Sequence, residues 1–369
     1  MEPYIPERLP LKEGLIDWAA HVTLIGKANA ALARYDGILQ GIVNPQVLLS
    51  PLMTQEAVVS SKIEGTITSM EEVLEFEASP NIKVSQEKRD DLQEVLNYRR
   101  AMGTAVNDMG KRPICINLIL DLHRILLSGV IRSEDKIPGS VRTTQNYIAA
   151  YGTPIERATF VPPMPQNVMP AFQNWEAYVH AEEKDPLVQL AVLKAQFELI
   201  HPFRDGNGRI GRILVPLILY GKELLSSPMF YISGYLDRNH EIYYNRLNAI
   251  SRKGDWNGWI SFFLQAILEQ AEENNRKARA IIDLYNQMKQ EIPEVTHSQY
   301  SLQILDTIFD RPIFNSNYFI SRSCLRRSTA QRALKSLIDN GVLLTIRRQS
   351  GRSPAWLCFR QLLKIAEDI

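Results

Sequence analysis

The chain has 369 residues, a length that exceeds one small domain and predicts two or three structural units. Hydrophobic residues make up 45% and charged residues 22% of the sequence, which is typical of a folded chain and excludes wholesale disorder. The formal net charge is only +1, so the chain as a whole is no polyanion binder. Residues 297–369 nevertheless carry 11 Lys and Arg against 5 Asp and Glu, and this basic block follows a mildly acidic body.

Three cysteines, Cys115, Cys324 and Cys358, are too few and too widely spaced for a disulfide framework or a thiolate zinc site. No apolar run approaches the roughly 18–20 residues that a membrane span needs. The first residues contain acids and prolines where a signal peptide has a basic start and an apolar stretch. We therefore expect a cytoplasmic protein with no membrane partner.

Apolar residues recur at three- and four-residue intervals, which predicts helices along most of the chain. The expected ranges are 15–32, 47–63, 91–109, 116–127, 186–200, 208–225, 243–249, 256–270 and 271–291. Strand signals occur only at 147–161, which predicts a hairpin, and at 342–359, which predicts another. The polar stretch 291–298 is the best candidate for a domain boundary.

One loop, at residues 201–212 with the sequence HPFRDGNGRIGR, joins two nearly apolar helices. Gly206 and Gly208 allow close backbone approach, and the amides that follow open a helix, an arrangement that favours phosphate oxygens. Arg209 and Arg212, three residues apart, add two guanidinium groups. The loop is not a Walker loop, because no GxxxxGK[ST] pattern occurs.

Two further side chains supply chemistry at the same loop. Asp205 offers a hard carboxylate for Mg²⁺ beside the phosphate cradle, and His201 has the pKa range of a general base. Taken singly, the residues of this loop have structural explanations, since a histidine often only forms a structural hydrogen bond and arginines are often solvated. Their convergence within twelve residues favours phosphate chemistry.

The segment resembles the HPFxDGNGRxxR motif of the Fic (Fido) family without a departure, and the similarity extends over most of the chain. The resemblance implies a mainly α fold: a Fic helical core with a β-hairpin flap, an N-terminal helical region and a C-terminal winged helix-turn-helix. It also implies a nucleotidyltransferase, a protein adenylyltransferase (AMPylator) that moves AMP from ATP to a Ser, Thr or Tyr hydroxyl of a protein and releases pyrophosphate.

The resemblance assigns a role to each residue of the motif. His201 takes the proton from the target hydroxyl, and Asp205 holds Mg²⁺ (or Mn²⁺) on the phosphates of ATP. Charge on the transferred phosphate is stabilised by Asn207 and the amides of Gly206, Gly208 and Arg209. Arg209 and Arg212 grip the β- and γ-phosphates. The remaining nucleotide contacts that the resemblance implies come from Thr159, Phe160 and Tyr243.

Residues 60–65, with the sequence SSKIEG, form what we call the inhibitory segment. Locally it is only a helix end, in which Ser60 and Glu64 share a face and Gly65 suits the stop. In the Fic family, however, Ser or Thr followed four residues later by Glu and then Gly or Asn marks an inhibitory helix. The resemblance implies that Glu64 forms a two-point fork with Arg212 and inhibits ATP use in cis. Self-AMPylation and AMP removal are left open.

Residues 300–369 have the element order of a winged helix-turn-helix. Basic residues lie on or near its predicted recognition helix and its wing: Arg326, Arg327, Arg332, Lys335, Arg347, Arg348 and Arg352. Such a domain binds DNA through phosphate contacts or serves as a protein-docking module, and both stay open. We expect three units, at 1–110, 111–292 and 293–369. A homodimer is a further open expectation.

Two other functions compete with adenylyl transfer. One is a transcriptional regulator in which the Fic body only senses a nucleotide, although pure binding would not need the base His201. The other is a different Fic-type transfer, of phosphate or phosphocholine, which the complete motif disfavours.

Overall fold

The computed structural model describes residues 2–42, 44–78, 83–131, 136–149, 153–347 and 354–367, and most of them lie in helices. This confirms the expected mainly α fold. Up to residue 253 the helices are α1 Trp18–Gly41, α2 Pro45–Leu48, α3 Ser50–Ile63, α4 Met70–Ala78, α5 Gln86–Met109, α6 Ile116–Leu126, α7 Pro165–Val179, α8 Pro186–Ile200, α9 Asn207–Gly221, α10 Ser233–Arg238 and α11 His240–Lys253.

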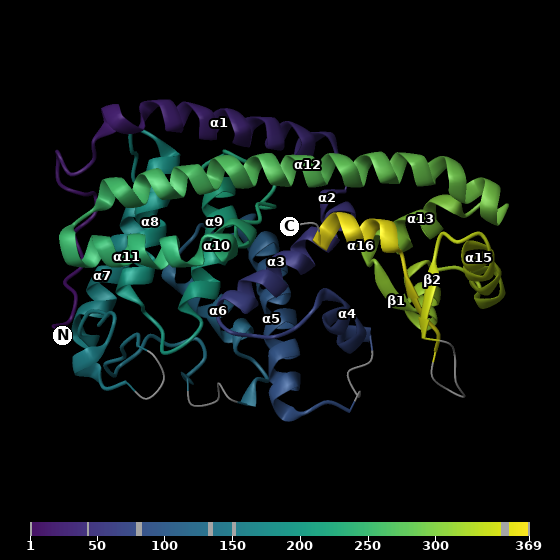
Figure 1. Cartoon of the computed structure of the whole chain (residues 1–369), viewed down its shortest axis with the longest axis horizontal. Helices are drawn as coiled ribbons and strands as arrows, with labels where there is room; N and C mark the ends of the chain where they lie inside the picture. Colours follow the sequence, from purple (N-terminus) through teal and green to yellow (C-terminus); the bar gives the residue numbers. More distant parts are fainter. Residues whose placement is uncertain are drawn as a thin grey trace.

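A single helix, α12 Trp256–Thr296, runs the length of the molecule beside α1 (Figure 1). The pattern predicted two helices here, at 256–270 and 271–291, and the structure corrects this. No helix breaker separates the two ranges, and Pro293 lies only in the last turns of α12. The helix begins where Asp255 accepts a hydrogen bond from the N–H of Gly258, and it ends at His297 in the left-handed conformation.

Helices α8 and α9 form the core of the central part. Every residue of α8 after Pro186 is buried, because the helix is apolar nearly all round and is enclosed by α1, α7, α9, α11 and α12. Asp185 starts α8 by accepting from the N–H groups of Leu187 and Val188. This buried pair of helices holds the loop at residues 201–206 between two rigid ends.

The apolar periodicity of the sequence did not predict some of the helices. Helix α4 is short, α7 contains Pro170 in its interior, and a last helix, α16 Arg360–Glu367, follows the C-terminal sheet. Among the described residues, no helix combines the length and the apolar character that crossing a membrane requires.

The predicted hairpin at 147–161 has one antiparallel bridge in the part of it that the structure describes. Ile148 pairs with Phe160: the N–H of Ile148 donates to the carbonyl of Phe160 at 2.9 Å, and the N–H of Thr159 donates back to Ile148 at 2.8 Å. A 3₁₀ turn, Ile155–Arg157, lies between the two arms, and residues 150–152 lie outside the described ranges. We call this segment the flap.

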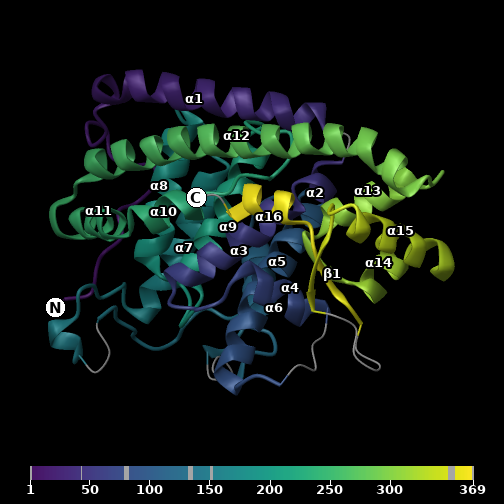
Figure 2. The same cartoon turned by 45° about the vertical axis from the view of Figure 1, so that its right-hand side comes forward.

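The C-terminal part has the order helix, strand, helix, helix and two strands that a winged helix-turn-helix requires (Figure 2). Its elements are α13 Ser301–Asp310, β1 Ile313–Asn315, α14 Ser316–Arg322, α15 Arg327–Asp339, β2 Leu344–Arg347 and β3 Trp356–Cys358. The strands form an antiparallel sheet in the order β1-β3-β2. This part packs on the body, where α13 and α16 contact α3 and β1 contacts α4.

We expect Phe197→Ala to lower the free energy of unfolding by about 3–5 kcal/mol, because it leaves a cavity in a packed aromatic cluster. Phe197 is 1% exposed, and its ring centroid lies 6.0 Å from that of Phe172 and 5.7 Å from that of Trp175. Urea denaturation followed by circular dichroism measures the loss. Val22→Ala, at a side chain 63% exposed on α1, is the control. An equal effect in the two variants would contradict the position of α8 in the core.

Candidate active site

The chain turns sharply where α8 ends, and the turn is fixed by protein groups. His201 has a left-handed backbone (φ +50°), and its N–H donates to the carbonyl of Phe197 at 3.1 Å. The buried Arg142 donates from Nε to the carbonyl oxygen of His201 at 2.8 Å and from Nη2 to that of Pro163 at 2.6 Å. His201 is therefore held at the mouth of the loop before any ligand binds.

The imidazole of His201 has a defined tautomer. Nδ1 lies 3.2 Å from the carbonyl oxygen of Glu198, which can only accept, so the proton belongs on Nδ1 and Nε2 keeps its lone pair. Burial lowers the pKa of His201 below its ordinary value, although the charge and the carbonyl of Glu198 oppose the shift. The ring is thus neutral at pH 7, the state that a general base needs.

The start of α9 has the backbone geometry of an anion site. Gly206 precedes the helix in the left-handed conformation (φ +78°), and the amides of 207–209 lie at the positive end of the helix dipole. A Cβ on Gly208 would lie 2.2 Å from Oε1 of Glu64 and 3.1 Å from Nη1 of Arg212, so a larger residue would displace the carboxylate of Glu64. The carboxylate of Glu64 occupies the place where this helix end favours an anion.

Asn207 closes the loop with its side chain. Its Oδ1 accepts from the N–H of Phe203 at 2.9 Å, and its Nδ2 donates to the carbonyl of Phe203 at 2.9 Å. The ring of Phe203 stacks on His123 with centroids 3.8 Å apart, which fixes the loop against α6. The side chain of Asn207 thus shapes the loop, and what it offers a ligand is its backbone amide.

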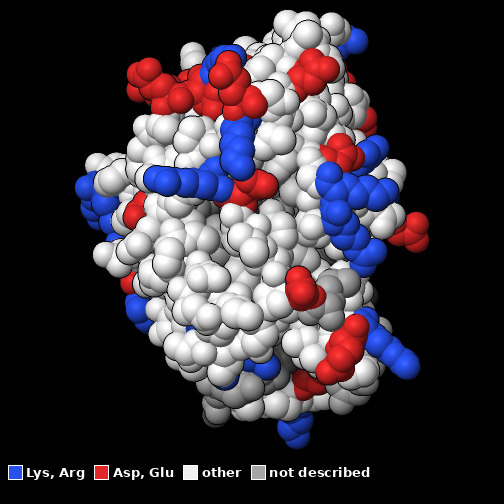
Figure 3. Space-filling model, turned by 90° about the vertical axis from the view of Figure 1, so that its left-hand side faces the viewer, with Lys and Arg blue, Asp and Glu red and all other residues white. Residues whose placement is uncertain are grey.

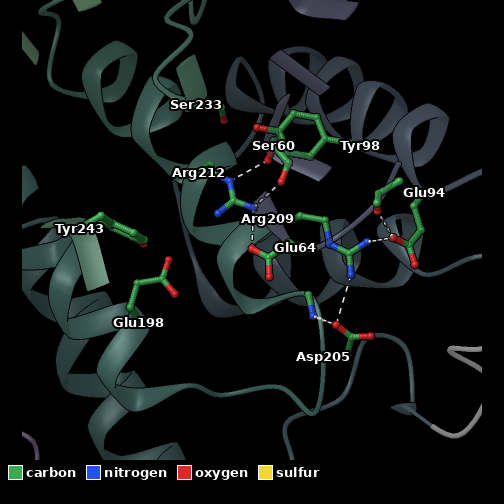
Figure 4. Close-up of polar contacts among 12 residues, drawn as sticks. Ser60, Glu64, Glu94, Tyr98, Glu198, Asp205, Arg209, Arg212, Ser233 and Tyr243 are labelled. Carbon is green, nitrogen blue, oxygen red and sulfur yellow. Dashed lines mark hydrogen bonds and ion pairs between the residues drawn. The ribbon is translucent and has the colours of Figure 1, made fainter. Parts of the chain in front are cut away.

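Arg209 points away from the cavity, although it lies only three residues before Arg212. Its Nη1 pairs with Oε2 of Glu94 at 2.6 Å and its Nη2 with Oδ1 of Asp205 at 3.2 Å (Figure 4). The sequence analysis did not identify Glu94 as the partner of Arg209, because this carboxylate belongs to α5 and lies 115 positions earlier in the chain. In this structure Arg209 therefore braces the loop against α5.

Asp205 has room for a cation on one oxygen. Both contacts of its carboxylate, with Arg209 and with the N–H of Gly206 at 2.6 Å, use Oδ1, and the side chain is 37% exposed. Within the described ranges, no cluster of three or more His, Cys, Asp or Glu side chains forms a metal site. Mg²⁺ is often held by one or two carboxylates together with substrate phosphates. A single carboxylate at the cradle fits that mode of binding.

Arg212 lies at the centre of the site and contacts the inhibitory segment. Its Nε donates to Oγ of Ser60 at 2.7 Å, and its Nη2 donates to the carbonyl of Ser60 at 2.8 Å and to Oε1 of Glu64 at 2.7 Å (Figure 4). The expected two-point fork with Glu64 is therefore a single contact. Nη1 of Arg212 is buried and has no partner among the described residues, which leaves a donor for a ligand.

Glu64 is ionised in this setting. Burial alone would raise the pKa of Glu64, but the charges of Arg212 and Arg209 outweigh it and hold the pKa below its ordinary value. The residue caps the C-terminal end of α3, and Gly65 follows in the left-handed conformation (φ +96°), a position that favours glycine. The end of this helix thus delivers a carboxylate to the start of α9.

The groups described above surround a cavity of about 430 Å³, which lies in the size range of small-molecule sites. It brings together His201, Glu64, the flap and α11. Its lining residues are Glu64, Ile148, Ala149, Thr159, Phe160, Glu198, Leu199, His201, Gly208, Arg212, Tyr243, Tyr244, Leu247 and Asn248. Asp205, Gly206, Asn207 and Arg209 lie outside this lining.

A buried charge pair lies behind the cavity wall opposite Glu64, with only Glu198 in the lining, and the sequence analysis did not identify it. Nζ of Lys194 pairs with Oε1 of Glu198 one turn later on α8 and lies 3.2 Å from Oη of Tyr243. Glu198 and Tyr243 face Arg212 and Glu64 across the site (Figure 4). The spacing of four residues on a helix could have predicted the Lys194–Glu198 pair, but it could not have predicted that the pair lies at the cavity.

A larger cavity, of about 660 Å³, lies at the other end of α9. Asp36, His180 and Lys222 are among its lining residues, but none of the loop residues 201–212 contributes to it. The nucleotide chemistry predicted from the motif therefore belongs to the smaller cavity.

Comparisons with known proteins match two family models to this chain: the Fic/DOC family N-terminal model at residues 22–107 and the Fic/DOC family model at residues 113–219. The protein adenylyltransferase fic-1 of Caenorhabditis elegans is 33% identical over 109 residues, which is 29% of this chain and 19% of that protein. The protein adenylyltransferase Fic of Drosophila grimshawi is 35% identical over 113 residues, 30% of this chain and 21% of its own. The matched segment thus spans about a fifth of the length of each of these two relatives.

Solved structures share the fold at low sequence identity. A Fic family protein from Desulfovibrio desulfuricans G20 superimposes with a TM-score of 0.57 at 18% identity, covering 97% of this chain and 98% of its own. Fic-1 of C. elegans gives a TM-score of 0.54 at 18% identity, with 71% and 72% covered. The two family models together account for more than half of the residues, and the chain belongs to the Fic/DOC family.

Proposed function

We propose that this chain is a protein adenylyltransferase that transfers AMP from ATP to a Ser, Thr or Tyr hydroxyl of a protein. The observation that carries the proposal is Nη1 of Arg212, which has no partner in the described part of the chain and lies beside the start of α9, where Glu64 occupies the anion position. A buried guanidinium and free helix amides are the donors that phosphate oxygens use. The neutral His201 lines the same cavity and supplies a base.

The reaction is one in-line displacement. Nε2 of His201 takes the proton of the target hydroxyl, whose oxygen attacks the α-phosphorus of ATP. The bond from that phosphorus to the bridging oxygen breaks, and pyrophosphate leaves with its electron pair. Amides of 207–209 stabilise the charge that develops on the α-phosphate. Bound Mg²⁺ would offset phosphate charge beside Asp205.

Glu64 acts as an inhibitor in cis, because α3 and the loop at 201–212 belong to one chain. Its carboxylate and the terminal phosphate of ATP are both anions that compete for Arg212 and for the start of α9. While Glu64 holds this place, the phosphates of ATP bind without the alignment that the reaction needs. We therefore expect weak activity in the wild-type protein.

Glu64→Gly should increase self-labelling from ATP with a labelled α-phosphate, in the presence of Mg²⁺, by roughly 10–100-fold. That range corresponds to one charge-assisted hydrogen bond of about 1.5–3 kcal/mol. An added AMP measured by intact mass identifies the product. Glu223→Gly is the matched control, since Glu223 also follows a helix end but lines the distant larger cavity. Equal labelling of wild-type and Glu64→Gly proteins would contradict the proposal that Glu64 is inhibitory.

His201→Ala in the Glu64→Gly background should reduce labelling about 10²–10⁴-fold, the usual contribution of a general base. Retained labelling would show that His201 is not the base. Nucleotide binding without transfer in any variant would favour the regulator alternative, and a phosphate-sized adduct would indicate kinase-type transfer.

The pH dependence of kcat/KM for ATP in the Glu64→Gly protein tests the state of the base. A base is lost as the pH falls through its pKa, and burial lowers the pKa of His201 from its ordinary value of 6.5. The charge of Glu64 opposes that shift, so its removal lowers the pKa further. We expect the acid limb to have its midpoint below pH 6.5, with Mg²⁺ in excess. A midpoint above pH 6.5 would contradict the buried, neutral imidazole.

A further inference from the structure

One helix of the C-terminal part, α15, divides cleanly into a buried and an exposed face. Its apolar residues pack inward, and the exposed residues are spaced three and four apart, as one helix face requires. The buried residues are Ala330, Ala333, Leu334 and Leu337, and the exposed ones of the first three turns are Arg327, Ser328, Gln331, Arg332 and Lys335. Helix α14 packs against α15, so the two form a helix-turn-helix.

Basic side chains gather on and beside the exposed side of α15. We call Arg326, Arg327, Arg332 and Lys335 the basic face; all four are exposed. No Asp or Glu occurs between Arg311 and Asp339 in the sequence. Among the described residues, no ion pair involves the basic face, so its charge is not neutralised by the protein.

Three other arginines of the C-terminal part form ion pairs with carboxylates. Arg311 pairs with Glu77 at 2.8 Å, Arg322 with Asp310 at 2.9 Å, and Arg347 with Glu75 at 3.3 Å. The contact of Arg347 corrects the expectation that it is a free wing residue, and Arg348 and Arg352 lie outside the described ranges. Among the described residues of this part, the exposed basic side chains without an ion pair are therefore the basic face and, on α16, Arg360 and Lys364.

We propose that α15 binds double-stranded DNA, with the basic face on the phosphates and its exposed turns in the major groove. That groove admits a helix, and the second helix of a helix-turn-helix is the one that enters it. Gln331, which is exposed on the same side of α15, has the side-chain amide that pairs with an adenine edge. The proposal does not depend on adenylyl transfer.

Other partners fit this face less well. Protein interfaces centre on apolar or aromatic anchors, and the exposed face of α15 has none. Single-stranded nucleic acids need aromatic platforms for stacking, which the face also lacks. The deep, narrow major groove of duplex RNA does not admit a helix. Duplex DNA is the polyanion whose shape and charge both match.

The position of α15 leaves room for a rod-like ligand. It lies at the end of the molecule away from the flap and α11 (Figures 1 and 2). At the opposite end, acidic and basic side chains are interspersed on a largely uncharged surface (Figure 3). Because the molecule carries a net charge of only +1, attraction of a polyanion depends on the local field of α15.

Fluorescence anisotropy with a labelled 30-base-pair duplex of mixed sequence tests the proposal on the full chain. Saturable binding is expected at 50 mM salt, and four phosphate contacts predict a loss of roughly 100-fold in affinity at 200 mM. Single-stranded DNA of the same sequence should compete at least roughly tenfold less well, because α15 offers no stacking platform.

Arg332→Glu/Lys335→Glu should weaken duplex binding at least roughly tenfold and reduce the salt slope by about two. Lys27→Glu/Arg34→Glu is the matched control, since both residues are exposed on one face of α1 and the charge change is the same. An unchanged thermal transition shows that each variant is folded. Absence of saturable duplex binding by the wild-type protein, equal losses in the two double variants, or equal binding of single strands would each overturn the proposal.

Discussion

The buried positive charge of Arg212 is the constraint on which the site depends. The residue is 1% exposed, and a buried charge without a counter-charge is strongly destabilising. Some anion must therefore lie beside it, either the carboxylate of Glu64 or, in the proposed function, the terminal phosphate of ATP. In the proposed function one position serves both anions, so inhibition by Glu64 and productive ATP binding exclude each other through the guanidinium of Arg212.

The fold holds helix α3, which carries Glu64, firmly in this position. Glu56, two turns before Glu64, accepts hydrogen bonds from the N–H of Ser233 at 3.0 Å and its Oγ at 2.6 Å, and from Oη of Tyr98 at 3.2 Å. Burial raises the pKa of Glu56, which these bonds partly offset. Helices α13 and α16 also contact α3, so the C-terminal part adjoins the inhibitory helix.

The sequence predicts what is local and misses what depends on distant packing. The twelve residues from His201 to Arg212 predict the loop, because both glycines and the polar side chains lie close together in sequence between two apolar helices; the chemistry of the loop stays a prediction. The partner of Arg209 could not be predicted, since Glu94 reaches it only when α5 packs against α9. The same holds for the Lys194 pair at the cavity wall and for α16 on α3. Periodicity also divided α12 in two, although nothing in the chain breaks it.

Isothermal titration calorimetry of ATP and ADP tests the competition for Arg212 most directly. The proteins compared are His201→Ala and Glu64→Gly/His201→Ala, so that no turnover occurs. If Glu64 competes with the terminal phosphate, removing Glu64 should strengthen ATP binding by roughly 10–100-fold, which is the contribution of one charge-assisted hydrogen bond. ADP binding should stay nearly unchanged. An equal gain for both nucleotides, or no gain for ATP, would show that Glu64 and the terminal phosphate do not share the site.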